Sequence, residues 1–127
     1  SRKANLLKRL VTNSSRVKIE CSNDLFGACR KISTTKFHFG IESAGVHIAN
    51  FCNVFNFCLM PGGHFKRFYP YENVFNPMQV DIYHKMDCFG CGHKCIFNIK
   101  NSEIFPCLDK ITVRDVLQEI RANLHEQ

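Results

Sequence analysis

The 127-residue chain contains no tryptophan, and its 11 Asp and Glu are outnumbered by 17 Lys and Arg. No apolar run approaches the roughly 20 residues of a membrane-spanning helix, so no membrane partner is expected. There is no glycine-rich phosphate loop, and no His-x-Glu element of the kind that precedes Cys-x2-Cys in zinc deaminases. The acidic residues are scattered, without the paired carboxylates of a polymerase metal centre. These absences indicate a binding protein rather than an enzyme.

Length and cysteine content set the class of protein. A chain of 127 residues fits one domain with a modest core, so residues 1–127 are expected to form a single zinc-binding domain. Six histidines accompany the eight cysteines, which favours metal binding in a reducing, intracellular compartment, nuclear or cytoplasmic. A secreted disulfide framework is the alternative, because the cysteine count is even and Asn13-Ser14-Ser15 is a glycosylation sequon. No signal peptide is visible, but the chain starts at Ser1, so a leader could have been removed.

The positive charge is concentrated at one end. Residues 1–36 carry nine Lys and Arg against Glu20 and Asp24, which gives this basic N-terminal part a net charge of +7. Such a segment suits a phosphate backbone, where each neutralised phosphate adds a salt-dependent increment of affinity. The alternative interpretation is a solvated charged face.

The densest motif is Asp87-Cys88-Phe89-Gly90-Cys91-Gly92-His93-Lys94-Cys95, which holds three of the eight cysteines. Two thiolates separated by two residues can hold one Zn²⁺, and the glycines allow the tight turn between them. Cys88 and Cys91 are therefore the firmest predicted ligands. Disulfide-bonded or free buried thiols are the alternatives.

A zinc site needs two further ligands from elsewhere in the chain. Cys58 and His64 are the best pair, because the Pro61-Gly62-Gly63 turn between them would bring them together. His84, Cys95 and His93 are substitutes. A second site that uses Cys21, Cys29, Cys52 or Cys107 stays open, although a lone cysteine such as Cys52 or Cys107 is more often a buried apolar thiol.

Residues 64–71 interleave two cations with four aromatic side chains. Aromatic stacking beside backbone-binding charges is how single strands are bound, at about 1–3 kcal/mol per stacked base. Ordinary core packing is the alternative for Phe65 and Phe68, whereas the tyrosines that flank Pro70 are better surface candidates. The predicted nucleic-acid contacts are Lys8, Arg9, Arg16, Lys18, Arg30, Lys31, Lys66, Arg67, Tyr69 and Tyr71.

Hydrophobic periodicity predicts an α+β fold with a small antiparallel sheet, a zinc-ribbon-like knuckle (residues 87–95) and a C-terminal helix. A short amphipathic helix is expected over 4–11, and a turn region around Asn23-Asp24 and Gly27. Strands are expected over 16–21, 34–41, 45–60 (with a bend near Asn53), 77–84 and 95–99. The last two flank the knuckle, as in a zinc ribbon spanning 58–125.

The C-terminal helix is predicted over 112–125. Thr112 is a suitable N-cap, and Asp115 follows three residues later, near the positive end of the helix. The predicted buried stripe consists of Val116, Leu117, Ile120 and Leu124.

Residues 58–124 resemble the zinc-binding domain of bacterial-type DNA primases. The resemblance rests on Tyr83-His84, Cys88-Phe89-Gly90-Cys91-Gly92, Ile96-Phe97-Asn98-Ile99 and the helix from Thr112. The primase family has Cys-Pro-x-His as its first ligand pair, whereas Cys58 and His64 here are further apart. The Cys-x2-Cys-x3-Cys run is also similar to that of the baculovirus late expression factor that partners a viral primase. Both resemblances imply template binding in replication.

The leading hypothesis is thus a zinc-stabilised nucleic-acid-binding module of viral replication or transcription, with single-stranded DNA or RNA as partner. A zinc-folded protein-interaction domain and a secreted disulfide-bonded protein are the alternatives.

Overall fold

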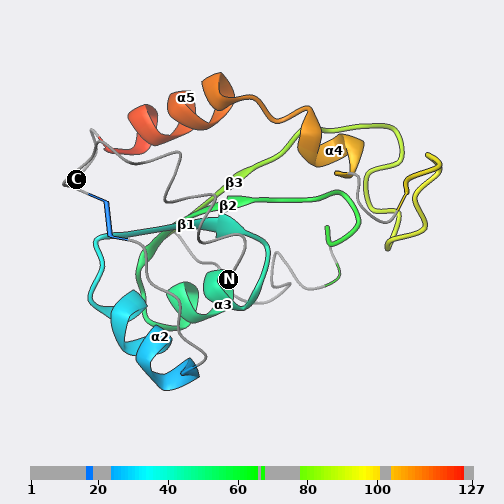
Figure 1. The fold of residues 1–127 in the computed structure, drawn as a ribbon. Helices are drawn as coiled ribbons and strands as arrows, with labels where there is room; N and C mark the ends of the chain where they lie inside the picture. The colour runs from blue at the N-terminus through cyan, green and yellow to red at the C-terminus, as the bar shows by residue number, and fades with distance from the viewer. Residues whose placement is uncertain (1–16, 19–23, 66, 68–77, 101–103, 125–127) are drawn as a thin grey trace.

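The structure is a computed structural model, in which residues 17–18, 24–65, 67, 78–100 and 104–124 are described (Figure 1). Among these residues, no helix has the length and apolar character that a membrane span requires. The predicted helix over 4–11, and most of the predicted strand over 16–21, lie outside the described residues. The elements in chain order are α2 (Leu25–Ser33), β1 (Phe37–Ile41), α3 (Ala44–Phe51), β2 (Phe55–Leu59), β3 (Gln79–Ile82), α4 (Pro106–Asp109) and α5 (Val113–Leu124).

The three strands form one sheet in the order β1-β2-β3, and both neighbouring pairs are parallel. Phe37 pairs with Phe55 at one end of β1, and Ile41 pairs with Leu59 at the other. The predicted α+β class with a small sheet and a C-terminal helix is confirmed, but the predicted antiparallel arrangement is wrong. The cause is the connection between β1 and β2, because a helical crossover returns the chain to the end of the sheet where the previous strand began.

That crossover, α3, occupies residues for which a strand was expected. The first half of the predicted strand is helical, and only the second half forms β2. Val46 and Ala49 lie on one face of α3 and are fully buried, so tertiary packing overrides the strand preference of the β-branched and aromatic residues. The predicted bend near Asn53 is confirmed, because Asn53 adopts a positive φ of 54°, which asparagine tolerates better than most residues.

A second helix also stands where a turn was expected. Asp24 caps α2 through its side chain, which accepts a hydrogen bond of 3.1 Å from the backbone N–H of Phe26. Arg30 and Lys31 lie in the last turn, where positive charge complements the helix dipole. The turn signals of Asn23-Asp24 and Gly27 therefore marked the start of a helix.

The two faces of the sheet are covered by different helices, with α5 on one side and α3 on the other (Figure 1). Side chains alternate along a strand, so Cys58 of β2 packs with Val46 and Met60 on the α3 side. Phe55 and Phe57 point to the α5 side. There they form a cluster with Ile82, against which Ile111, Val116 and Ile120 pack.

The prediction of the C-terminal helix is confirmed, including its cap at Thr112. Two of its four predicted core residues differ, because Leu117 and Leu124 are exposed. The strand predicted over 77–84 is confirmed as β3. The strand predicted over 95–99 is wrong, since residues 95–100 are described and contain no strand. The knuckle therefore follows a strand without a returning partner, so the strand-knuckle-strand pattern of a zinc ribbon is not formed.

Candidate functional site

The candidate site lies where the parallel strands end. Glu42 follows β1, the Pro61–His64 turn follows β2, and the knuckle follows β3. Because the strands are parallel, these three segments all leave the sheet at the carboxyl ends of the strands. Open parallel sheets place their ligands at this end. A cavity of about 190 Å³ lies between these segments and α4. It is smaller than the roughly 300 Å³ of ordinary small-molecule pockets.

Sulfur and imidazole groups converge on this cavity from three parts of the chain. The turn after β2 contributes one histidine, the knuckle contributes four residues, and α4 contributes one cysteine. The four cysteines are half-buried and free of disulfide bonds. Soft sulfur and nitrogen donors of this kind suit Zn²⁺ rather than Mg²⁺ or Ca²⁺. The donors are His64, Cys88, Cys91, His93, Cys95 and Cys107.

Left-handed backbone conformations shape the knuckle. Gly90 and Gly92 have φ values of 90° and 57°, which glycine adopts without a steric penalty. His93 has a φ of 69°, an uncommon value for a residue with a side chain. The Lys94 N–H donates to the Cys91 carbonyl at 3.1 Å, which closes the turn.

Gly62 attaches the knuckle to the sheet. Its carbonyl accepts a hydrogen bond of 2.8 Å from the Gly90 N–H, and its own N–H donates to the Cys107 sulfur at 3.4 Å. Phe89 packs so closely against Gly62 that a Cβ there would lie 2.8 Å from the ring. The turn after β2 thus holds both the knuckle and α4 in place.

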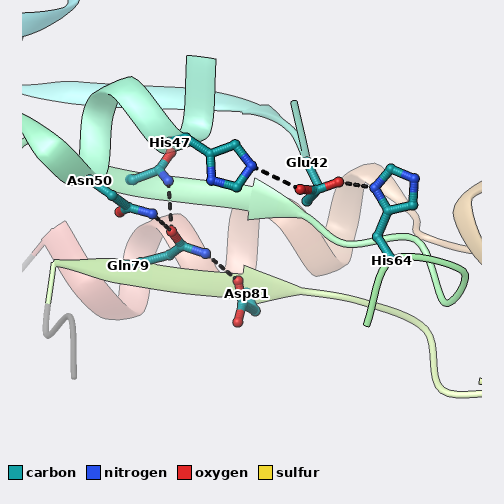
Figure 2. Close-up of polar contacts among 7 residues, drawn as sticks. Glu42, His47, Asn50, His64, Gln79 and Asp81 are labelled. Atoms are coloured by element: carbon teal, nitrogen blue, oxygen red, sulfur yellow. Dashed lines mark hydrogen bonds and ion pairs between the residues drawn. The ribbon is translucent and has the colours of Figure 1, made fainter. Parts of the chain in front are cut away.

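Glu42, directly after β1, lies between two histidines (Figure 2). Only 7% of the residue is exposed. One carboxylate oxygen contacts His47 Nε2 at 3.1 Å, and the other contacts His64 Nδ1. Burial lowers the pKa of His64, and the neighbouring His93 and Arg67 lower it further. The rings of His64 and His93 meet edge to face, with centroids 4.3 Å apart.

The structure brings most of the predicted ligands together. Cys88, Cys91 and His64 line the cavity, as do the substitutes Cys95 and His93. His84 lies elsewhere, in a groove between β3 and α5.

Cys58 also lies apart from the cavity. It is completely buried on the α3 side of β2, where burial raises the pKa of its thiol to about 12, with a further contribution from Asp81. A thiol with this pKa resists the deprotonation that metal binding requires.

Two residues of the site were not assigned to it from the sequence. Cys107 was left open as a ligand of a second site, with a buried apolar thiol as the favoured alternative, but it lines this cavity from α4. Glu42 carried one weak signal, a lone acidic residue between an alternating strand and an apolar run.

The donors line the wall of the cavity, but their sulfur and nitrogen atoms are not close enough together to contact one ion. In the described parts of the chain, no three Cys, His, Asp or Glu side chains are grouped closely enough to hold a metal ion as they stand. A bound ion would therefore require side chains to turn inward from the cavity wall. The donor chemistry fits zinc.

The predicted nucleic-acid contacts are divided by the structure. Lys18 and Arg67 are exposed, and Arg30 and Lys31 are exposed on α2. Figure 1 places α2 at the opposite end of the molecule from the knuckle. The remaining predicted contacts, Lys8, Arg9, Arg16, Lys66, Tyr69 and Tyr71, lie outside the described residues.

Comparison of the chain with protein-family models, with curated proteins and with solved structures gives no match. Function is therefore inferred from the cavity, its donors and the surrounding surface.

Proposed function

We propose that this domain is a zinc-stabilised nucleic-acid-binding module. Cys88, Cys91 and His64 hold the ion, and the fourth ligand is Cys95 or Cys107. The observation that carries the proposal is the convergence of soft donors from three segments on one small cavity. Four protein ligands leave no open position for a reacting group, so the zinc has a structural role.

Apart from its contacts with Gly62, the region around the knuckle has no regular secondary structure to hold it. Residues 83–100 contain no helix or strand, although all of them are described. Phe89 packs its ring against two neighbours, with centroids 4.9 Å from Phe65 and 5.4 Å from Tyr83. Structural zinc contributes about 10–16 kcal/mol of apparent binding free energy in small zinc domains. A metal cross-link between the knuckle and the turn after β2 would therefore stabilise a segment that lacks regular structure.

The surface near the knuckle suits a nucleic acid. Within residues 83–100, Lys85, Lys94 and Lys100 are exposed cations, and Asp87 is the single carboxylate. Lys85 also lines a groove with Asp81, Asp115 and Glu119, so the cations away from those carboxylates are Lys94 and Lys100. Tyr83 is 49% exposed, while one side of its ring is supported by Phe89. A half-exposed aromatic ring packed on a neighbouring ring, in a segment with three exposed lysines, supports base stacking on a single strand.

A protein-interaction domain is the second candidate, and one observation favours it. Phe39 and Ile41 of β1 are about half exposed, on the same side of the sheet as α5. An apolar strand at a sheet edge is a common docking surface for another chain. If this domain binds a protein, zinc would stabilise the fold, and the affinity for the protein partner would not depend on salt.

Mass spectrometry tests the metal first. Native and denatured intact masses are measured on full-length protein purified without added metal. The expected result is one zinc ion in the native species, with every thiol reduced in the denatured one. A denatured mass lighter by two hydrogens per bridge, with no metal, would overturn the proposal in favour of the disulfide alternative.

Fluorescence anisotropy then tests nucleic-acid binding with labelled single-stranded DNA and RNA between about 50 and 200 mM salt. Affinity should fall linearly in a log-log plot, with a slope of about −0.7 per neutralised phosphate. The Lys85→Gln/Lys94→Gln variant should bind more weakly, and its slope should be smaller by up to about 1.4. The matched control is Arg114→Gln/Arg121→Gln, which removes two exposed cations from α5. Affinity that does not respond to salt would contradict nucleic-acid binding.

A further inference from the structure

We infer that Glu42 is a positioning residue for the zinc ion, because its carboxylate orients His64 so that Nε2 is presented to the cysteine-lined cavity. This inference rests on the zinc site proposed above. It adds a residue that makes no contact with the ion.

The placement of Glu42 is fixed by the fold. Its N–H donates to the Leu59 carbonyl at 3.1 Å, directly beyond the last paired residues of β1 and β2. Only 3% of its side chain is exposed. A buried carboxylate is costly unless its oxygens are partnered, and here each oxygen has its own histidine partner. Glu42 is therefore held at one point and in one orientation.

The hydrogen bond to Glu42 selects the form of the His64 ring. A carboxylate only accepts, so His64 Nδ1 carries the hydrogen and donates it to Glu42. In the neutral ring Nε2 then has a free lone pair, which is what a metal ligand needs. Figure 2 shows the second ring nitrogen of His64 pointing away from Glu42. Because His64 also lines the cavity, this geometry is that of a carboxylate–histidine–metal arrangement.

His47 provides an internal control for this role. It contacts the other oxygen of the same carboxylate, but it does not line the cavity. Removing His47 takes away one partner of Glu42 and leaves the His64 contact in place. Metal affinity should therefore depend on Glu42 and not on His47.

The experiment measures Co²⁺ and Zn²⁺ affinity of the full chain by absorption, with a chelator as competitor. Glu42→Gln keeps the shape but offers an N–H₂ group or a neutral oxygen to His64, so affinity should fall about 10–100-fold. The thiolate-to-cobalt charge-transfer band should keep its intensity, because the number of sulfur ligands does not change. His47→Gln should bind like the unmodified chain.

A ligand swap separates positioning from a general effect on folding. His64→Cys replaces the imidazole by a thiolate, which needs no carboxylate to set its tautomer. In the His64→Cys background, Glu42→Gln should have no effect on metal affinity. An equal loss of metal affinity in both backgrounds would show that Glu42 acts only by stabilising the fold, and it would overturn the inference. If the unmodified chain bound no metal, the proposed function itself would fail, which is a different result.

Discussion

The Nδ1 atom of His38 on β1 lies 2.8 Å from the side-chain oxygen of Asn56 on β2. This contact begins a polar network that crosses the sheet on its α3 side. The Asn56 amide donates to Gln79 on β3 at 2.9 Å, and the Gln79 amide donates to Asp81 at 2.6 Å. Asn50 of α3 joins the network at Gln79 (Figure 2). His38 is half-buried beside this partner.

Asn56 is the residue on which this network depends. It is completely buried, and its side chain bonds to one residue on each neighbouring strand. Asn56→Ala would leave the donor of His38 without its partner, and an unsatisfied buried group costs about 1–3 kcal/mol. We expect the free energy of unfolding in urea to fall by that amount. The control is Asn50→Ala, which removes a half-buried side chain and leaves the contacts between strands intact. Equal effects from the two variants would contradict a network centred on Asn56.

Cys58 should behave as a core residue and not as a zinc ligand. With its pKa near 12, the Cys58 thiol stays protonated at neutral pH. Iodoacetamide labelling of the folded, metal-free protein should therefore modify the cavity cysteines first, and Cys58 only after unfolding. Cys58→Ala should keep the full zinc content and lose about 1 kcal/mol of stability, the usual cost of a methyl-sized cavity. Loss of the metal in Cys58→Ala would return Cys58 to the ligand set.

Local signals explain which parts of this fold were predictable. The C-terminal helix was found because Thr112 and Asp115 form its cap within one turn. Cys88 and Cys91 were placed at one site because only two residues separate them. In contrast, Val46 and Ala49 fit a strand or a helix equally well. Only their burial against the sheet determines that this segment is helical. Misreading that helix also led to the wrong strand orientation, because α3 is what makes β1 and β2 parallel.

Long-range contacts explain what was missed at the site. Glu42 reaches the cavity because β1 and β2 end together, a consequence of parallel pairing that the antiparallel prediction excluded. Cys107 reaches it because α4 packs beside Gly62, and no spacing rule connects these two residues. Cys58 was predicted as a ligand because the Pro61-Gly62-Gly63 turn separates it from His64, whereas alternation along β2 directs its side chain to the opposite side from Phe57. The Cys88–Cys91 motif could thus be predicted from the sequence, but the residues that join it at the cavity depend on tertiary structure.

Asp115 should make the stability of the protein depend on acid pH. It accepts hydrogen bonds of 2.8 Å from the backbone N–H and from the hydroxyl of Thr112, and these lower its pKa below the ordinary value of 3.8. A carboxyl whose pKa is lower in the folded chain stabilises it above the unfolded pKa. That contribution is lost as the pH falls through the folded pKa. Thermal unfolding should therefore show a decline below about pH 4 that Asp115→Asn reduces.

The partner variant for this test is Thr112→Ala, which removes the hydroxyl. Because both residues form one cap, the double variant Thr112→Ala/Asp115→Asn should lose less stability than the two single losses combined. A pH profile that Asp115→Asn leaves unchanged would show that the cap contributes nothing to acid sensitivity.

Gly62 should be the residue least tolerant of a methyl group near the cavity. A Cβ at this position would lie 2.8 Å from Cδ2 and 3.3 Å from Cε2 of Phe89. The Phe89 ring cannot move away easily, because it is packed against Phe65 and Tyr83. Overpacking of this kind costs about 1–3 kcal/mol, and here it would push the knuckle away from the turn after β2. We expect Gly62→Ala to lower both the melting temperature and the zinc affinity.

Two further variants show whether the clash with Phe89 is the cause. Gly90→Ala is the comparison within the knuckle, because nothing lies within 4 Å of its Cβ and only its φ of +90° opposes the substitution. Gly62→Ala/Phe89→Leu gives the new methyl group room, so it should bind zinc more tightly than Gly62→Ala alone. If Phe89→Leu does not restore affinity, the loss arises from the Gly62 backbone, whose N–H and carbonyl hold Cys107 and Gly90. In that case the hydrogen bonds of the turn, and not the Phe89 contact, set the position of the knuckle.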